Sequence, residues 1–456
     1  MPIIKKSERL GKEKIGKLLI KLSVPAIIGM VIQSLYNIVD TIYVGKLSTE
    51  ALSALSLAFP IQMIIIALGV GTGVGASSLI SRLLGAGNKE RAENAAEHVF
   101  FIAIIFGVVT AIVGGFFAED IIKLFTDSKQ LINLTMQYIP VIMIGSIAVY
   151  IPATFNYILR GEGNTVVPMI TMIIGAVTNI ILDPFLIFGI WIFPELGIAG
   201  AAYATIASRL LGGIFITKVL LSDKNELTLR LKYFKLDLKI LKEIYEVGFP
   251  AMVNRLLFSF AFALINKILG TFNTTAIGVM GVIFRLQSFF MMAIFGLNQG
   301  FLPIVGYNYG HKNPKRMKRA IKLGGLTSLS FGTFGFLLFF LFPNTLLGIF
   351  NRNPEFLSIG VNAFRRVSFA YMFMSLNIIG VSTFQAMGRG FPSLALTVLR
   401  QMILLVPGIY ILGNVVGLNS AWLSFPIAES ITFIILSFWL YNCINKEVSL
   451  MKEYLV

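Results

Sequence analysis

Long apolar runs recur along nearly the whole chain, and they restrict its fold more than any other feature of the sequence. Stretches of about 20 hydrophobic residues follow one another from Leu18 to Tyr441, and each is long enough to cross a hydrocarbon core of roughly 30 Å as a helix. The period-two alternation typical of outer-membrane barrel strands is absent from these runs. The pattern therefore predicts an all-α membrane protein.

The composition agrees with lipid as the main solvent of the chain. Of its 456 residues, 56% are hydrophobic and 13% are charged, whereas a soluble domain carries about 25% charged residues. Cys443 is the only cysteine, and His98 and His311 are the only histidines. A disulfide framework, a thiolate metal site and a histidine-based metal centre are therefore not expected, and no cofactor is predicted.

The apolar runs divide into twelve expected membrane helices. The chain shows neither a catalytic cluster nor a soluble sensing domain between them, so an enzyme or a non-transporting receptor is not expected. The expected helices cover residues 17–45, 51–81, 98–118, 130–159, 165–190, 198–221, 243–270, 276–309, 321–343, 358–387, 393–413 and 418–441.

Lysines and arginines gather in alternate connecting segments, and they account for the net charge of +16. The segment after the sixth helix contains Lys235, Lys239 and Lys242, and the segment after the eighth contains Lys315 and Lys318. By the positive-inside rule these segments face the cytoplasm. We therefore expect a multi-pass protein of the cytoplasmic membrane, with both termini cytoplasmic and no nucleic acid partner.

The chain also repeats itself at an almost constant offset. Six helices in each half make the halves parallel repeats with a site between them, so the fold class is two pseudo-symmetric six-helix bundles. The expected domains are 1–221 (N-terminal lobe, helices 1–6), 222–242 (cytoplasmic linker) and 243–456 (C-terminal lobe, helices 7–12). The matches at offset 225 include Pro25 with Pro250, Gln62 with Gln287, Gly71 with Gly296, Gly75 with Gly300, Gly85 with Gly310 and Asn88 with Asn313.

Carboxylates one turn from amides occur on two of the expected helices. Gln33, Asn37 and Asp40 share one face of the first helix, and Asn179 and Asp183 share one face of the fifth. An intramembrane carboxylate is costly and marks a functional site by default. Desolvation and a neighbouring negative charge both favour the protonated carboxyl, so such a pair can hold and release a proton. The alternative is that both acids lie at water-facing helix ends.

Further polar residues in the same lobe are candidates for the ion-coupling and substrate site. They are Tyr36 on the first helix, Asn156 on the fourth, and Tyr203 and Thr205 on the sixth. Lone polar residues of this kind can also serve only to hydrogen-bond a neighbouring helix. Pro25 removes a backbone hydrogen bond from the first helix, and it is predicted to act as a hinge, with a static kink as the alternative.

Several intramembrane charges besides the acidic pair require partners. Glu429 lies in the middle of the twelfth helix and is expected to form a structural ion pair with Arg285, or alternatively with Arg400. Arg209 and Arg255 also fall within apolar runs. These cations are not balanced by acids, so an anionic substrate remains an alternative to a purely cationic one.

Several segments resemble the MATE (multidrug and toxic compound extrusion) family of the MOP superfamily. The resemblance covers nearly the whole chain and is closest to the prokaryotic branch that carries its acidic pair in the N-terminal lobe. The segments that carry it are Leu22–Met30 with Tyr36–Asp40, Gly73–Ser77 with Ser81–Ala86, Leu159–Asn164 and Asn179–Pro184.

The resemblance implies a rocker-switch antiporter that exports amphipathic organic cations in exchange for H⁺ or Na⁺. The coupling ion would act at Asp40 and Asp183, and a Na⁺ ion would add Asn179. Some relatives carry a carboxylate on the seventh helix where this chain has Phe258, and the tenth helix offers Asn377 but no acid, so no ion site is expected in the C-terminal lobe. The expected partners are a small amphipathic organic substrate and membrane lipid, and we expect a monomer. The alternative function is a lipid-linked saccharide flippase of the same superfamily.

Overall fold

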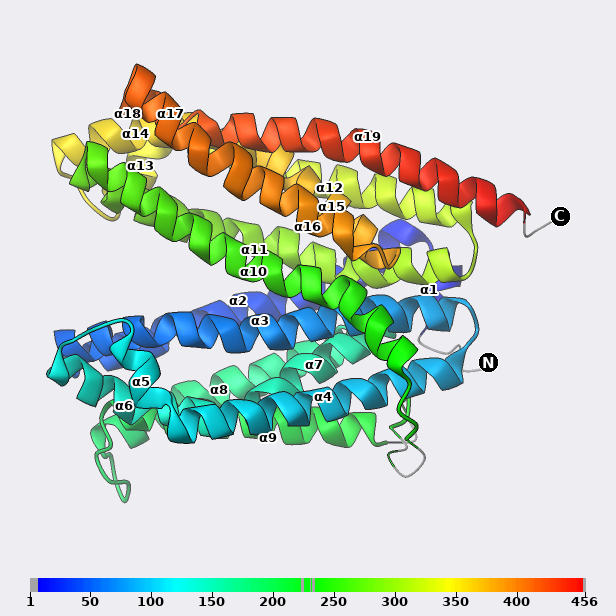
Figure 1. Ribbon diagram of the computed structural model, residues 1–456, viewed down its shortest axis with the longest axis horizontal. Helices are drawn as coiled ribbons and strands as arrows, with labels where there is room; N and C mark the ends of the chain where they lie inside the picture. Colours follow the sequence, from blue (N-terminus) through cyan, green and yellow to red (C-terminus); the bar gives the residue numbers. More distant parts are fainter. Residues whose placement is uncertain (1–6, 223–224, 230, 232–233, 454–456) are drawn as a thin grey trace.

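A computed structural model of the chain describes residues 7–222, 225–229, 231 and 234–453, and the regular structure within these residues is helical. Parts of the predicted N-terminal and linker segments lie outside this description. Figure 1 shows the helices as two bundles stacked on one another, with α1 and the last turns of α19 at the same end of the molecule. We call this end the terminal side and the opposite end the open side.

The helices before residue 222 form one bundle. They are α1 (Glu8–Lys12), α2 (Ile15–Gly45), α3 (Thr49–Gly85), α4 (Lys89–Phe116), α5 (Ala118–Lys123), α6 (Lys129–Ile144), α7 (Ile147–Gly161), α8 (Val166–Phe188) and α9 (Ile198–Leu220).

The helices after residue 237 form the other bundle. They are α10 (Leu238–Phe272), α11 (Thr274–Gly310), α12 (Pro314–Leu341), α13 (Pro343–Gly348), α14 (Pro354–Ser368), α15 (Ala370–Ala386), α16 (Gly390–Val398), the π-helical segment η2 (Leu399–Leu405), α17 (Val406–Val416), α18 (Leu418–Ala421) and α19 (Ser424–Glu453).

The described residues contain ten helices long and apolar enough to span a membrane, and twelve spans if each of two bent pairs counts as one. The pairs are α6 with α7, bent by 51°, and α14 with α15, bent by 44°. They begin at Lys129 and Pro354, which are repeat mates at the offset of 225, so the bend recurs in both lobes. The predicted all-α membrane fold is confirmed, although the helices predicted at 130–159 and 358–387 are each broken in two.

Helix starts on the terminal side lie earlier than the apolar pattern predicted. The prediction began the third helix at 98, but α4 starts at Lys89, where the side chain of Asn88 accepts a hydrogen bond from the backbone N–H of Arg91. Asn313 caps α12 in the same way. The charged first turns extend beyond the apolar span, because the asparagine side chain satisfies a backbone N–H at the helix start.

Glycines allow the two lobes to touch backbone to backbone on the terminal side. A Cβ atom at Gly85 would lie 2.0 Å from the carbonyl oxygen of Tyr307, and one at Gly310 would lie 2.0 Å from that of Arg82. Arg82 and Tyr307 are themselves repeat mates at the same offset, so each contact is the image of the other. The repeat in the sequence is therefore also a repeat in the packing.

Within the described residues, the lobes pack against each other on the terminal side. The largest buried apolar cluster combines residues of both lobes, including Leu18, Leu79, Ile244 and Phe301. The other two clusters each belong to one lobe. Among the described residues, the hydrogen bonds that join the lobes also lie on this side, such as that from Ser78 Oγ to the carbonyl oxygen of Gln385 at 2.5 Å.

On the open side, side chains that face the opposite lobe are exposed. Ile64 lies seven residues before Gly71, and its repeat mate Phe289 lies seven residues before Gly296. Seven residues are two helical turns, so both side chains share the lobe-facing direction of these glycines. Ile64 is 52% exposed and Phe289 is 57% exposed. The lobes are therefore in contact at the glycines and apart two turns farther along.

Candidate functional site

The predicted carboxylate of the fifth span is fully buried. Asp183 and Asn179 lie on α8, each with 0% of its surface exposed. The side-chain amide of Asn179 donates to Oδ1 of Asp183 at 3.1 Å. Oδ2 of Asp183 and Oδ1 of Asn179 are buried and have no hydrogen-bond partner among the described residues. The α8 turn thus presents oxygens that can still accept a proton or a cation.

The predicted carboxylate of the first span comes to the same place. α2 packs closely on α8, where Gly29 lies against Met169 and Met172. Asp40 lies near the open end of α2, and its Oδ1 is buried without a partner in the described part of the chain. Asp40 and Asp183 are near enough to interact electrostatically. The helices bring together the two acids that the sequence singled out on separate spans.

Two members of this cluster were not predicted. Tyr138 on α6 is buried and lies within electrostatic reach of both Asp40 and Asp183. The side-chain amide of Gln62 on α3 donates to the Tyr138 hydroxyl at 2.9 Å. Gln62 belongs to the repeat matches, which drew attention to its position and not to its chemistry. Nothing in the local sequence distinguishes Tyr138 from other tyrosines of the spans.

The remaining predicted site residues differ in how deeply they are buried. Gln33 and Tyr36 are partly buried on α2, while Asn37 is exposed. Asn156 is buried on α7, and its Oδ1 has no partner among the described residues. Thr205 is partly buried on α9, but Tyr203 on the same helix is 50% exposed.

An arginine outside the predicted site contacts one of its members. Arg209 on α9 donates to the hydroxyl of Tyr36 at 2.5 Å, and its guanidinium lies 5.6 Å from the centre of the Tyr36 ring. Tyr203 lies six residues before Arg209, about 120° away around the helix. The face of α9 that meets Tyr36 is therefore not the face that carries Tyr203.

The predicted ion pair between Glu429 and Arg285 is wrong. Glu429 Oε1 lies 3.2 Å from Nη1 of Arg400, and Glu429 Oε2 accepts a hydrogen bond of 2.7 Å from the amide of Asn377. α19 packs against η2 and α15, which supply Arg400 and Asn377. Arg285 is exposed on α11. The alternative partner, Arg400, is the correct one.

Pro25 lies inside α2, which continues through it as one helix. The hinge role of Pro25 stays a prediction.

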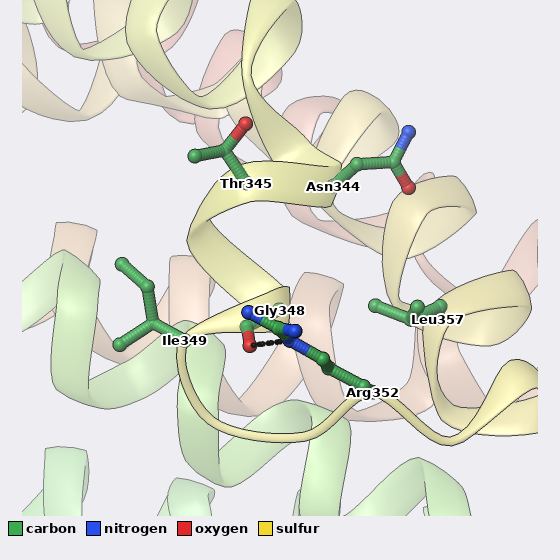
Figure 2. A pocket seen from close by; sticks show the side chains of 6 residues that line it. All are labelled: Asn344, Thr345, Gly348, Ile349, Arg352 and Leu357. Atoms are coloured by element: carbon green, nitrogen blue, oxygen red, sulfur yellow. Dashed lines mark hydrogen bonds between the residues drawn. The ribbon is translucent and has the colours of Figure 1, made fainter.

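The described residues hold no group of three His, Cys, Asp or Glu side chains arranged to bind a metal ion. Figure 2 shows a hollow between α13, the loop after it and the start of α14, lined by Asn344, Thr345, Gly348, Ile349, Arg352 and Leu357. It belongs to the other lobe from the acids, so it is no part of their site.

Comparison with known proteins decides the family. The model of the MatE family matches residues 25–185 and 250–411, one match in each half of the chain. The chain belongs to the MatE family. It is thus a multi-pass membrane transporter and not an enzyme, as the sequence predicted.

Similar proteins cover almost the full length of this MATE transporter. It is 28% identical over 421 residues to the multidrug export protein MepA of Staphylococcus saprophyticus, covering 92% of both chains. It is also 28% identical to the FAD transporter of Shewanella oneidensis, covering 91% of this chain and 92% of the relative.

A solved structure has the same fold. It is described as the outward-facing conformation of a multidrug resistance MATE family transporter of the MOP superfamily. The TM-score is 0.90 at 28% identity, over 96% of this chain and 98% of the other.

Proposed function

We propose that this MATE transporter is a secondary active antiporter that exports amphipathic organic cations in exchange for H⁺ or Na⁺. The observation that carries the proposal is the meeting of Asp40 and Asp183 inside an apolar lobe. The multidrug export protein among its relatives supports efflux as the direction of transport. The alternative of a lipid-linked saccharide flippase is not favoured by these relatives.

The coupling ion would bind where buried oxygens lack partners. Oδ1 of Asp40, Oδ2 of Asp183 and Oδ1 of Asn179 are all in this state within the described chain. Buried polar atoms without partners are costly, and a proton or a Na⁺ ion would remove that cost. Neutralising the acids also removes their mutual repulsion, so ion binding changes the energy with which α2 and α8 pack.

Alternating access would use the glycine contacts as the closed gate. With the terminal side in the cytoplasm, as the positive-inside rule predicts, the lobes are closed inward and parted outward. A substrate can then leave to the outside and the coupling ion can reach the acids. Rocking of the lobes would open the terminal side and close the open side, in the manner of pseudo-symmetric repeat transporters.

Purified protein in liposomes tests the function directly. We expect export of a fluorescent organic cation to be driven by an imposed pH gradient or by an imposed Na⁺ gradient, each applied alone. Movement driven by only one gradient identifies the coupling ion. Equal movement with and without both gradients would overturn antiport.

A further inference from the structure

Two arginines of the C-terminal lobe lie within membrane-spanning helices and have no hydrogen-bond or ion-pair partner in the described part of the chain. Arg255 lies at the middle of α10, and Arg285 lies about a third of the way along α11. Both side chains are exposed. Among the described residues, neither guanidinium forms a hydrogen bond or an ion pair with the protein. A charge held without a partner at membrane depth is expensive and points to a function.

The helix geometry directs both arginines toward the N-terminal lobe. α10 touches α3 through Gly248 and Met252, which lie against Gly71. Arg255 follows these residues by seven and three positions, so it continues the same face. On α11, Gly296 touches Ile27 of α2, and Arg285 precedes Gly296 by eleven positions, which is close to three turns.

Both arginines lie beyond the glycine contacts, where the lobes are apart. Arg285 is one turn beyond Phe289, whose side chain is 57% exposed on the same face. The ring of Phe284 lies 4.4 Å from that of Phe262 and 5.7 Å from that of Phe258. Phe284 directly precedes Arg285, so Arg285 lies at the same height along the bundle as Phe258 and Phe262 of α10. Arg255 lies roughly 5–10 Å nearer the terminal side, at 1.5 Å per residue.

The surroundings suit an anion attached to an apolar body. Phe258 and Phe289 expose aromatic surface beside the arginines. Guanidinium groups bind carboxylate, sulfonate and phosphate through paired N–H donors. Glu429, an acid buried inside this lobe, already accepts hydrogen bonds from Asn377 and Arg400. Glu243 and Glu246 lie near the terminal end of α10, twelve and nine positions before Arg255, and among the described residues no acid forms an ion pair with Arg255 or Arg285.

The repeat does not copy this feature. At the offset of 225, Arg255 corresponds to Met30 and Arg285 to Pro60, while Asp40 corresponds to Ile265. The N-terminal lobe thus holds the pair of Asp40 and Asp183, and the C-terminal lobe holds Arg255 and Arg285. From this separation we propose that Arg255 and Arg285 form a binding subsite for the anionic group of an amphipathic substrate, so that exported molecules include zwitterions and organic anions. The subsite deepens the proposed export function and rests on it.

A pair of dyes that differ by one charge tests the subsite. Rhodamine B carries a carboxylate, and its ethyl ester has the same fluorophore without that charge. Binding of each dye to the purified full-length protein in neutral detergent is measured by fluorescence polarisation. We expect Arg255→Gln and Arg285→Gln to weaken binding of rhodamine B about tenfold, as for loss of a charged hydrogen bond, and to change ester binding less than twofold. The matched control is Arg352→Gln, an exposed arginine of the outer loop in Figure 2, which should change neither.

The outcomes distinguish a substrate anion from a lipid headgroup, and they distinguish failure of the subsite from failure of ion-driven export. Equal loss of both dyes in folded variants, or loss of neither, overturns the subsite, and Arg255→Lys should retain part of the carboxylate preference. Addition of phosphatidylglycerol that displaces rhodamine B from wild type, but leaves both arginine variants unaffected, would assign the subsite to a lipid headgroup and overturn the substrate proposal. The binding assay needs no ion gradient, so failure of ion-driven export would leave its result standing.

Discussion

The side-chain amide of Asn179 donates to Oδ1 of Asp183 one helical turn away, at 3.1 Å. This bond restrains the carboxylate, and the second carboxylate oxygen is buried without a partner in the described chain. Asp40 on α2 lies near enough for its charge to reach Asp183. Two carboxyls placed in this way can act as one binding unit.

Replacing either acid by its amide should remove coupling without removing the fold. Asp40→Asn and Asp183→Asn keep the shape of the side chain but cannot lose a proton. Each is expected to lower gradient-driven export about tenfold or more, and the double variant should be hardly worse, since residues that act as a unit are not additive. The measurement is the initial export rate per inserted protein in liposomes. Full export by both single variants would place the coupling site elsewhere.

Glu429 should behave differently, because its partners are structural. Glu429→Gln leaves the largely covered Arg400, whose side chain is 16% exposed, without a counter-charge, and breaking a buried pair costs about 3 kcal/mol or more. We expect a lower unfolding temperature in detergent, with export per folded molecule close to that of wild type. The double variant Glu429→Leu with Arg400→Leu removes both charges and should recover most of the loss. A stable Glu429→Gln protein without coupling would contradict this role.

Much of the fold was readable from local sequence, because lipid makes apolar length a strong signal. The offset of 225 pairs Gly85 with Gly310 in the sequence, whereas their reciprocal contacts appear only in the structure. The breaks between α6 and α7 and between α14 and α15 were missed, since apolar composition is continuous across them. The local sequence pattern predicts that a membrane span exists, but it does not predict whether the helix is straight or bent.

The site was predicted only where its chemistry lies on one helix. The pair of Asn179 with Asp183 follows from spacing along α8. The contact of Arg209 with Tyr36 joins two helices far apart in the sequence, and it depends on how α9 rotates against α2. The ion pair of Glu429 with Arg400, and not with Arg285, likewise depends on the rotation of α19, because that rotation decides which cation faces the acid.

Membrane orientation can be tested at two lysines of the basic segments. Lys235 and Lys315 are exposed on the terminal side, which the charge distribution places in the cytoplasm. After replacement of the buried Cys443, single cysteines at these positions should react with an impermeant thiol reagent only from the cytoplasmic face. Thr49→Cys on the open side should react only from outside. Labelling in the reverse pattern would overturn the orientation.

Movement of the lobes can be followed at the start of α3 and of α11. Thr49 and Thr274 are exposed first residues of these helices and are repeat mates at the offset of 225. Spin labels at the two positions should show a shorter distance when substrate or a change of pH closes the open side. A distance that stays constant under all these conditions would contradict rocking of the lobes.

The glycine contacts give the sharpest test of the gate. A methyl group at Gly310 would lie 2.0 Å from the carbonyl oxygen of Arg82, which backbone cannot avoid without separating the lobes. We expect Gly310→Ala to disfavour the closed terminal side, to shorten the Thr49–Thr274 distance and to lower export several-fold. Gly85→Ala should do the same from the other lobe, through Tyr307.

A control on the same helix separates this effect from helix propensity. Gly281 also lies in α11, and a Cβ atom there meets nothing within 4 Å. In a helix interior alanine is favoured over glycine by about 1 kcal/mol, so Gly281→Ala should hold or raise stability and leave both distance and export unchanged. Gly310 is the last residue of α11 and its φ is not positive, so alanine brings no backbone strain there, and a loss in Gly310→Ala comes from the contact between the lobes. Normal export by Gly310→Ala would show that this closed arrangement is not needed in the transport cycle.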